Sequence, residues 1–385
     1  MAADLSGVVT MKTRAAICWG VGQEWSVEEV ELDPPRVGEV LVRLAATGLC
    51  HSDDHIPTGD SPMPTPMIGG HEGSGVVEEV GPGVNALAPG DHVVLAFIPS
   101  CGRCPPCSTG HQNLCDLGAL IGYGRQVDGT SRHHARGQDV NLMCLLGAFA
   151  DHTVVNEASC VRIDPAHSLR TACLVGCGAV TGWGSAVYAA DTRPGDTVVV
   201  VGIGGIGASA LQGARLAGAE AVVAIDPVEF KRDKATGFGA DATFASMAEA
   251  FAPLKEMTRG RMADKVIMAL GVGRGDLMNQ ALDLAAKRGR VVVTNIHPYA
   301  ERQVSMSLSK LTGLEKQVVG SLFGSANPRA DIPKLLELDR AGQFDLGGLV
   351  TRSYGLDQVN QGYRDLKSGF NIRGILTLDQ QLAGG

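Results

Sequence analysis

One short segment of the chain has cysteines at the spacing of a metal site. In CGRCPPCSTGHQNLC, Cys101, Cys104, Cys107 and Cys115 follow the pattern C-x2-C-x2-C-x7-C. Two-residue gaps let consecutive thiolates converge on one tetrahedral ion, and a short loop can return the fourth. Four thiolates complete the coordination shell and leave no position for a substrate. The pattern therefore predicts a structural zinc; an iron–sulfur cluster fits the same ligands less well, and the spacing argues against simple buried cysteines.

Three separated segments contain a second group of possible metal ligands. They are GLCHSDDH (48–55), GGHEGSG (69–75) and GCG (176–178). Each is a weak signal alone, because a single Cys or His is more often a buried core residue than a ligand. Together they offer two thiolates and one imidazole, the ligand set with which a catalytic zinc keeps its fourth position open. The segments therefore predict a second zinc site, where a reaction takes place.

A glycine-rich turn follows an apolar strand in the second half of the chain. After the valines of 198–201, the glycines Gly202, Gly204 and Gly207 fit GxGxxG, with Gly205 between them. These glycines permit a tight turn, approach of a pyrophosphate to the backbone, and close packing of a helix expected to begin near Ala208. The turn therefore predicts a phosphate-binding site.

An acidic residue at the end of the next apolar strand indicates which dinucleotide binds. Asp226 stands 19 residues after Gly207, where a carboxylate can hydrogen-bond both ribose hydroxyls and repels a 2′-phosphate. NAD is therefore favoured over NADP, and Lys231 on the following helix is expected to reach the adenosine ribose. The order of strand, glycines, helix, strand and acid favours a bound cofactor over a βαβ unit that has lost it.

The hydrophobic pattern predicts the elements that position these residues. From about residue 12 to 175, short apolar runs broken by Gly and Pro indicate a β-rich, barrel-like domain. From about 179, β-branched runs alternate with segments of helical period, which is typical of a parallel sheet with crossover helices. The tail contains a helical pattern and a closing strand that should rejoin the first domain. We expect domains at 1–178, with the cysteine lobe at about 97–117, at 179–322, and at 323–385 as a return to the first.

Composition limits the classes of function. With 385 residues the chain suits two domains, and its net charge of −8 gives no electrostatic reason to bind nucleic acid or an anionic membrane. The N-terminus lacks a long apolar segment, which predicts a cytoplasmic, soluble protein with residues 1–10 as an extension of unassigned role. Ten cysteines without a secretion signal indicate metal or thiolate chemistry rather than disulfides. Cys18, Cys144, Cys160 and Cys173 are expected to be buried thiols.

Four motifs in order resemble those of the zinc-containing medium-chain alcohol dehydrogenases over nearly the whole chain. They are GLCHSDDH, GGHEGSG, the four-cysteine segment and GCG…VGIGGIG. The resemblance implies an α/β fold in which a doubly wound Rossmann domain is inserted into a GroES-like β-rich catalytic domain. It also implies two zinc ions per chain, NAD(H), an alcohol or aldehyde substrate, and a homodimer or homotetramer.

The resemblance assigns roles to individual residues. Cys50, His71 and Cys177 match the catalytic zinc ligands, and Glu72 matches a residue that coordinates transiently. Asp53 is expected to orient His71. Ser52 and His55 match a proton relay that runs through the cofactor ribose hydroxyl. His51 and Arg373 match positions that contact the pyrophosphate, and Phe97 and Leu145 are candidates for lining the substrate pocket.

Three alternatives stay open at this stage. FIPSCGRCPPCSTGHQNLCDLGA and GSLFGSANP are most similar to an actinobacterial group that includes nicotinoprotein alcohol dehydrogenases, which keep NAD(H) bound and pass electrons to an external acceptor. A glutathione-dependent formaldehyde dehydrogenase is disfavoured, because that group has tyrosine where this chain has His55 and arginine soon after the fourth cysteine. A metal-free NADPH reductase or a binding protein is disfavoured by the seven zinc-ligand positions and Asp226. The alcohol itself is not predicted.

Overall fold

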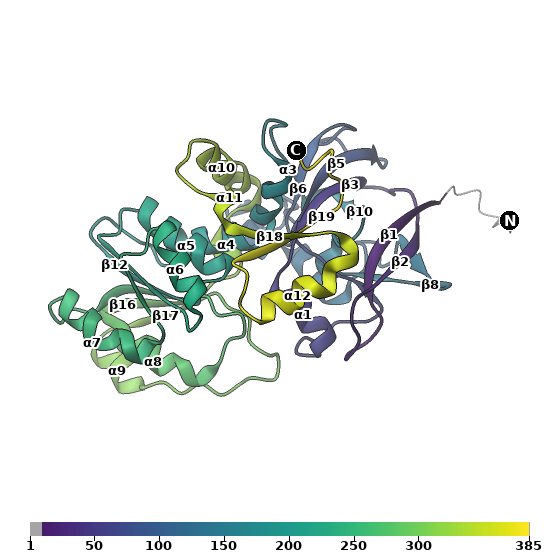
Figure 1. Cartoon of the computed structure of the whole chain (residues 1–385). Coiled ribbons are helices and arrows are strands. Elements are labelled where there is room, and N and C mark those ends of the chain that lie inside the picture. The colour runs from purple at the N-terminus through teal and green to yellow at the C-terminus, as the bar shows by residue number, and fades with distance from the viewer. Residues whose placement is uncertain (1–9, 385) are drawn as a thin grey trace.

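Two lobes make up the molecule. The computed structural model describes residues 10–384 and shows a β-rich lobe formed by the first part of the chain beside an α/β lobe formed by the middle part (Figure 1). The C-terminal segment, yellow in Figure 1, returns to the junction of the two lobes. Residues 1–9 of the predicted extension at 1–10 lie outside the described residues.

The α/β lobe is built on one six-stranded sheet whose paired strands all run parallel. Its central strands are runs of valine and isoleucine buried on both faces, as a sheet covered by helices on each side requires. The strand order is β14 (Ala242–Phe244), β13 (Ala221–Ile225), β12 (Thr197–Val201), β15 (Ala263–Met268), β16 (Ala285–Val293) and β17 (Gln317–Gly320). This is the doubly wound order of a dinucleotide-binding domain, with its topological switch point between β12 and β15.

Helices of this lobe connect the parallel strands across the faces of the sheet (Figure 1). They are α5 (Gly205–Leu216), α6 (Glu229–Gly237), α7 (Met247–Met257), α8 (Met278–Leu284) and α9 (Leu308–Gly313). The predicted start of α5 near Ala208 is wrong by three residues. The helix begins at Gly205, because the glycines after Gly204 already form its first turn.

The β-rich lobe contains two sheets. One has the order β8 (Gln138–Asp139), β7 (His133–Ala135), β2 (Ser26–Leu32), β1 (Met11–Cys18), β4 (Met67–Ile68) and β9 (Asn141–Leu142). The other has the order β11 (Cys160–Arg162), β6 (His92–Leu95), β5 (Gly73–Val80), β3 (Glu39–Gly48), β19 (Arg373–Thr377) and β18 (Val350–Tyr354), and β10 (His152–Asn156) also pairs with β3. The helices outside the α/β lobe are α1 (His51–Thr58), α2 (Pro105–Ser108), α3 (Leu169–Ala172), α4 (Gly178–Gly184), α10 (Pro328–Arg340), α11 (Leu346–Leu349) and α12 (Val359–Lys367).

The tail returns to the first lobe through strand pairing. β19 pairs antiparallel with β3, so that Ile375 stands opposite Gly48, at the end of the strand that leads into α1. The predicted fold class, a Rossmann domain inserted into a β-rich domain, is therefore confirmed. The boundaries at residues 178 and 322 stay predictions.

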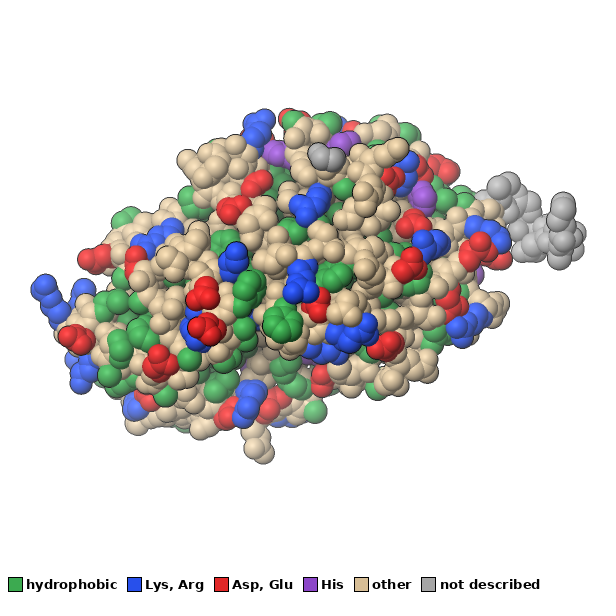
Figure 2. All heavy atoms as spheres, in the orientation of Figure 1, with side chains coloured by type: hydrophobic (Ala, Val, Ile, Leu, Met, Phe, Trp, Pro, Cys, Tyr) green, Lys and Arg blue, Asp and Glu red, His purple; other side chains and the backbone are tan. Residues whose placement is uncertain are grey.

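The largest hydrophobic core extends across both lobes. It includes Val94 of β6, Trp183 of α4 and Leu211 of α5, and it fixes the two lobes against each other. No single helix among residues 10–384 is long and apolar enough to cross a membrane; one bent pair, Leu169–Gly176 with Gly178–Ala189, meets the criteria of length and composition. On the face seen in Figure 2, acidic and basic side chains are interspersed.

Candidate active site

Three chain segments bring Cys50, His71 and Cys177 together at the junction of the lobes. Cys50 is the extended residue before α1, where β3 ends. His71 lies in the turn between β4 and β5, and Cys177 immediately precedes α4. With Glu72, these residues offer ligand atoms that all lie within 4.8 Å of one another, and all four residues are buried. The separated signals in the sequence thus meet at one place.

Asp53 fixes the orientation of the His71 ring. Its Oδ1 lies 3.0 Å from His71 Nδ1 and accepts a hydrogen bond from the Gly70 amide at 2.8 Å. The ring therefore donates from Nδ1 and leaves Nε2 free to act as a ligand, which is the usual arrangement around a metal-binding histidine. Asp53 is completely buried, so the carboxylate cannot exchange this contact for solvent.

The two cysteines at this site shift each other's pKa in opposite directions. The Cys177 thiol hydrogen-bonds to Cys50, which holds the pKa of Cys50 well below the ordinary thiol value and raises the pKa of Cys177 well above it. One thiolate is thus already favoured within a buried site. Two cysteine sulfurs and one imidazole nitrogen are ligand types that suit zinc, so the donor set fits the predicted ion.

Glu72 and Arg373 form a buried ion pair next to the cysteines. The Arg373 guanidinium contacts Glu72 Oε2, while Glu72 Oε1 accepts the Gly178 amide at 3.0 Å. Burial raises the pKa of Glu72, and Arg373 opposes that rise. Arg373 Nε is buried and has no hydrogen-bond partner among the described residues. A Cβ added to Gly205 would collide with Arg373 Cδ, so this arginine lies directly against the start of α5.

The predicted relay residues Ser52 and His55 lie on α1. Ser52 Oγ is 3.5 Å from Cys50 Sγ, beside the predicted zinc. The His55 side chain is only 6% exposed, and its Nδ1 lies 3.3 Å from Asp60 Oδ2. Its Nε2 is buried without a hydrogen-bond partner among residues 10–384. His55 therefore has one nitrogen turned to a carboxylate and one without a protein partner.

The glycine turn has the geometry expected for a phosphate site. Gly202 has φ +91°, and a Cβ on Gly207 would collide with the Gly202 carbonyl oxygen, so both positions need glycine for the turn itself. A Cβ on Gly204 would meet no heavy atom within 4 Å among the described residues. This open space before the N-terminus of α5 fits a pyrophosphate, which is stabilised by the free amides and the dipole of a helix start.

The remaining predicted cofactor residues surround the same edge of the sheet. Asp226 is buried, and its two oxygens accept the amides of Ile203 at 2.7 Å and Val228 at 2.9 Å. Each oxygen retains a lone pair for a ribose hydroxyl. Burial lowers the pKa of His51, and the positive charge of Lys231 adds to that lowering. A weakly protonated His51 is a poor permanent countercharge for a phosphate.

The four-cysteine segment forms a separate cluster. The Sγ atoms of Cys101 and Cys107 are 4.0 Å apart, and those of Cys104 and Cys115 are 3.9 Å apart. All four ligand atoms lie within 4.8 Å of one another. Zinc–sulfur bonds of about 2.3 Å give tetrahedral edges of roughly 3.8 Å, so these distances fit one zinc ion.

Two residues that were not predicted as site residues also lie at the site. Asp60 contacts His55, and Tyr363 of α12 donates to the Cys50 carbonyl oxygen at 3.3 Å. Phe97, a pocket candidate, lies edge-on to the His71 ring with centroids 5.8 Å apart. Leu145, the other candidate, is 1% exposed within the hydrophobic core.

The sequence contains little to indicate the two unpredicted residues. Asp60 is an acidic residue five positions after His55, and no sequence feature points to Tyr363.

Comparison with known proteins agrees with this arrangement. A family model described as the alcohol dehydrogenase GroES-like domain matches residues 36–165, and one described as zinc-binding dehydrogenase matches 205–340. Alcohol dehydrogenase B of Mycobacterium tuberculosis is 51% identical over 368 residues, which cover 95% of this chain and 98% of that protein. The chain belongs to the zinc-binding alcohol dehydrogenase family.

Other members of the alcohol dehydrogenase family are similar along their full lengths. The NDMA-dependent alcohol dehydrogenase of Amycolatopsis methanolica is 49% identical over 366 residues, covering 95% of this chain and 99% of that protein. A solved zinc-binding-domain alcohol dehydrogenase from Burkholderia ambifaria has a TM-score of 0.91 at 31% identity, covering 97% of this chain and all of that one. Benzyl alcohol dehydrogenase from Acinetobacter calcoaceticus has a TM-score of 0.89 at 28% identity, covering 96% and 99%. The predicted resemblance to an actinobacterial group of alcohol dehydrogenases is confirmed.

Proposed function

We propose that this protein oxidises alcohols, and reduces the corresponding aldehydes or ketones, by hydride transfer to and from NAD, with one catalytic and one structural zinc per chain. The observation that carries the proposal is the position of Arg373. It contacts Glu72 beside the Cys50, His71 and Cys177 cluster and also lies against Gly205 of the dinucleotide turn. A metal site and a cofactor site joined by one side chain suit hydride transfer at a metal-held oxygen.

The two zinc ions and NAD would be held by residues already described. Cys50, His71 and Cys177 would hold the catalytic zinc, and Cys101, Cys104, Cys107 and Cys115 the structural one. Gly202, Gly204, Gly205, Gly207, Asp226, Lys231, His51 and Arg373 would surround NAD. When bound, zinc favours the alkoxide form of an alcohol oxygen, and the nicotinamide accepts a hydride.

The chain's own residues position the reactants and move the proton. Asp53 keeps His71 in the ligating orientation, and Glu72 is held beside the ligands by Arg373 and the Gly178 amide. Ser52, near Cys50, is placed to take the alcohol proton, and His55 is placed to carry it outward. The ring of Phe97 lies edge-on to His71 and packs against Phe323, with the two phenyl centroids 5.2 Å apart, and would limit access of water to the site.

Within this function we favour the nicotinoprotein form, in which NAD(H) stays bound and an external acceptor removes the electrons. The similarity to an enzyme named NDMA-dependent supports this form. Purified protein should release nicotinamide nucleotide on denaturation and should oxidise an alcohol with NDMA when no NAD is added. Protein that contains no nucleotide but reduces added NAD would instead support an ordinary dehydrogenase, which binds and releases NAD in each catalytic cycle.

Two measurements test the wider proposal. Elemental analysis should give two zinc ions per chain, and clearly fewer would favour the metal-free alternatives. NAD reduction that is faster with S-hydroxymethylglutathione than with simple alcohols would favour the formaldehyde dehydrogenase.

We also propose that the protein is cytoplasmic and forms a homodimer or homotetramer. Light scattering would test the oligomeric state. Neither a nucleic acid nor a membrane is expected as a partner.

A further inference from the structure

The end of α1 holds His55 against an exposed carboxylate. Asp60 Oδ2 lies 3.3 Å from His55 Nδ1 and accepts the Thr58 hydroxyl at 2.7 Å. The Asp60 side chain is 42% exposed, whereas that of His55 is 6% exposed. Asp60 is therefore the point at which the buried imidazole reaches solvent.

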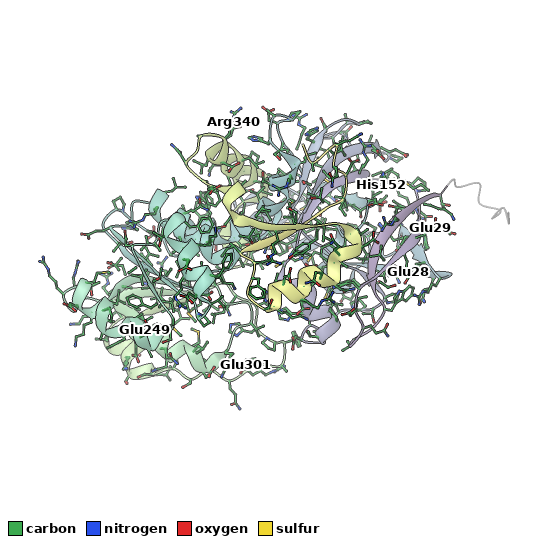
Figure 3. All side chains as sticks on the ribbon, in the orientation of Figure 1. Glu28, Glu29, His152, Glu249, Glu301 and Arg340 are labelled. Carbon is green, nitrogen blue, oxygen red and sulfur yellow. The ribbon has the colours of Figure 1, made fainter. Side chains whose placement is uncertain are left out.

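The turn after α1 is built to keep Asp60 in this position. Gly59 ends the helix with a left-handed φ of +78°, which turns the chain back along the last helical turn. The Ser61 amide then donates to the His55 carbonyl at 3.2 Å. From the other lobe, the Tyr299 amide lies 3.4 Å from the Asp60 carbonyl oxygen. Tyr299 belongs to the loop after β16 that Glu301 marks in Figure 3, so both lobes hold this turn.

The two nitrogens of His55 have opposite surroundings. Nδ1 faces Asp60, while Nε2 is buried and has no hydrogen-bond partner in the described part of the chain. A carboxylate can only accept, so it selects the tautomer that carries its proton on Nδ1 and leaves a lone pair on Nε2. Thr58 and then His55 lower the pKa of Asp60, which keeps it ionised near neutral pH.

We propose that Asp60 is the outer positioning residue of the proton path: it selects the Nδ1–H tautomer of His55 and takes the proton from that imidazole to solvent. This inference rests on the proposed function, which supplies one proton for each alcohol oxidised. Arrival of that proton forms an N–H bond at Nε2, and the Nδ1–H bond breaks as its proton moves to the Asp60 carboxylate. Water then removes the proton from Asp60, and exchange with solvent between turnovers restores the starting tautomer.

Two other ionisable groups of α1 have different neighbours from His55. The His51 ring lies against Gly271 of the α/β lobe, where a Cβ would be 3.1 Å from His51 Nε2. Asp54 lies 3.2 Å from Lys367 Nζ of α12. Asp60 is thus the carboxylate that contacts His55 in the described residues.

The test compares Asp60→Asn, Asp60→Glu, His55→Gln and the Asp60→Asn/His55→Gln double variant in the zinc-loaded protein with its nucleotide. Loss of a supporting contact of this kind costs about tenfold or more, so Asp60→Asn should lower kcat about tenfold and change KM less than about twofold. Asp60→Glu should restore most of the rate. The double variant should be no slower than His55→Gln, because Asp60 acts through His55. Glu24→Gln, which removes an exposed carboxylate paired with Arg364, is the matched control and should match the wild type.

A second readout follows the tautomer directly. With selective nitrogen-15 labelling of histidine, the His55 signals are those lost in His55→Gln, and they should report Nδ1–H in the wild type and a changed tautomer ratio in Asp60→Asn. If Asp60→Asn changes neither the tautomer nor kcat, the inference is overturned. It is also overturned if the kcat losses of the two single variants multiply fully in the double variant, or if His55→Gln is fully active. In those cases an active wild type leaves the proposed function standing. A wild type that oxidises no alcohol with NAD or NDMA overturns both.

Discussion

At the scale of single residues, several buried polar groups in this protein are held by specific side-chain partners. Asp53 holds His71, Arg373 holds Glu72, and Thr153 Oγ1 lies 3.4 Å from the buried His133. Such groups have no access to water, so the loss of a partner changes the protonation or the orientation of the group that remains. The effects of substitution should therefore be specific and measurable.

Asp53→Asn should weaken zinc binding at the catalytic site by about tenfold or more, because a neutral amide supports the His71 ring less well than a carboxylate. Competition with a chromogenic chelator measures this change, with the four-cysteine site as an internal reference. Asp54→Asn is the matched control, since Asp54 faces Lys367 rather than His71. Equal zinc affinity in Asp53→Asn and the wild type would contradict this role.

His133 should make stability fall as the pH is lowered. Burial lowers its pKa to about 3, so below the ordinary value of about 6.5 the unfolded chain takes up a proton that the folded chain cannot. The free energy of unfolding should fall by about 1.4 kcal/mol per pH unit from this residue alone. Between pH 7.5 and pH 5, the wild type should lose about 2 kcal/mol more than His133→Gln in urea unfolding. Parallel losses in the two proteins would show that His133 is not the cause.

At the scale of elements, glycines in the turn from β12 into α5 are needed for two different reasons. Gly207 is required by the fold, because its Cβ would collide with the Gly202 carbonyl oxygen. Gly204 faces open space and has an ordinary φ of −88°, so the fold itself tolerates a methyl group there. The same motif thus contains one structural and one ligand-facing position.

Gly204→Ala and Gly207→Ala should therefore fail in different ways. Gly204→Ala should lose bound nucleotide, because the methyl group occupies the pyrophosphate position, and should match the unfolding midpoint of nucleotide-free wild type within about 1 kcal/mol in stability. Gly207→Ala should lose about 1–3 kcal/mol through overpacking, whether or not nucleotide is present. Nucleotide released on denaturation and urea unfolding of each variant provide the two readouts. Full nucleotide content in Gly204→Ala would place the cofactor elsewhere.

At the scale of the whole molecule, the Arg373–Glu72 pair joins segments that are far apart in the chain. Arg373 begins β19 in the C-terminal return, Glu72 precedes β5, and both lie against the insertion point of the α/β lobe. The two side chains are 7% and 0% exposed. A buried pair of this kind is costly to break from one side only.

Arg373→Met should destabilise the protein by about 3–5 kcal/mol, because it leaves the Glu72 charge buried and unpaired. The Glu72→Gln/Arg373→Met double variant should recover part of this loss, since a neutral amide can still accept the Gly178 amide. Urea unfolding of zinc-loaded samples measures both. A double variant that is less stable than Arg373→Met would contradict this account of the pair.

The sequence by itself determined the elements and ligand types whose signals are local. The valine-rich strand before Gly202, Asp226 after the next strand, and the spacing of Cys101 to Cys115 each depend on residues close together in the chain, where strand pleat, turn geometry and loop length fix the relative positions. The catalytic ligands were recognised as types in separate motifs, and the family resemblance then joined them. β2, β17 and β18 are partly exposed and have no long continuous apolar run, so the hydrophobic pattern gives little local signal for them.

Only the tertiary structure decided which distant groups became partners. His55 meets Asp60 because Gly59 reverses the chain, and Arg373 meets Glu72 because β19 pairs with β3 across more than three hundred residues of sequence. A charge or an imidazole in a sequence does not specify its partner, since Coulomb and hydrogen-bond energies depend on distance and burial rather than on position in the chain. The zinc ligands, and through the family resemblance Asp53, Ser52 and His55, could therefore be listed from the sequence. The contact of Asp60 with His55 and the pairing of Arg373 with Glu72 became visible only in the fold.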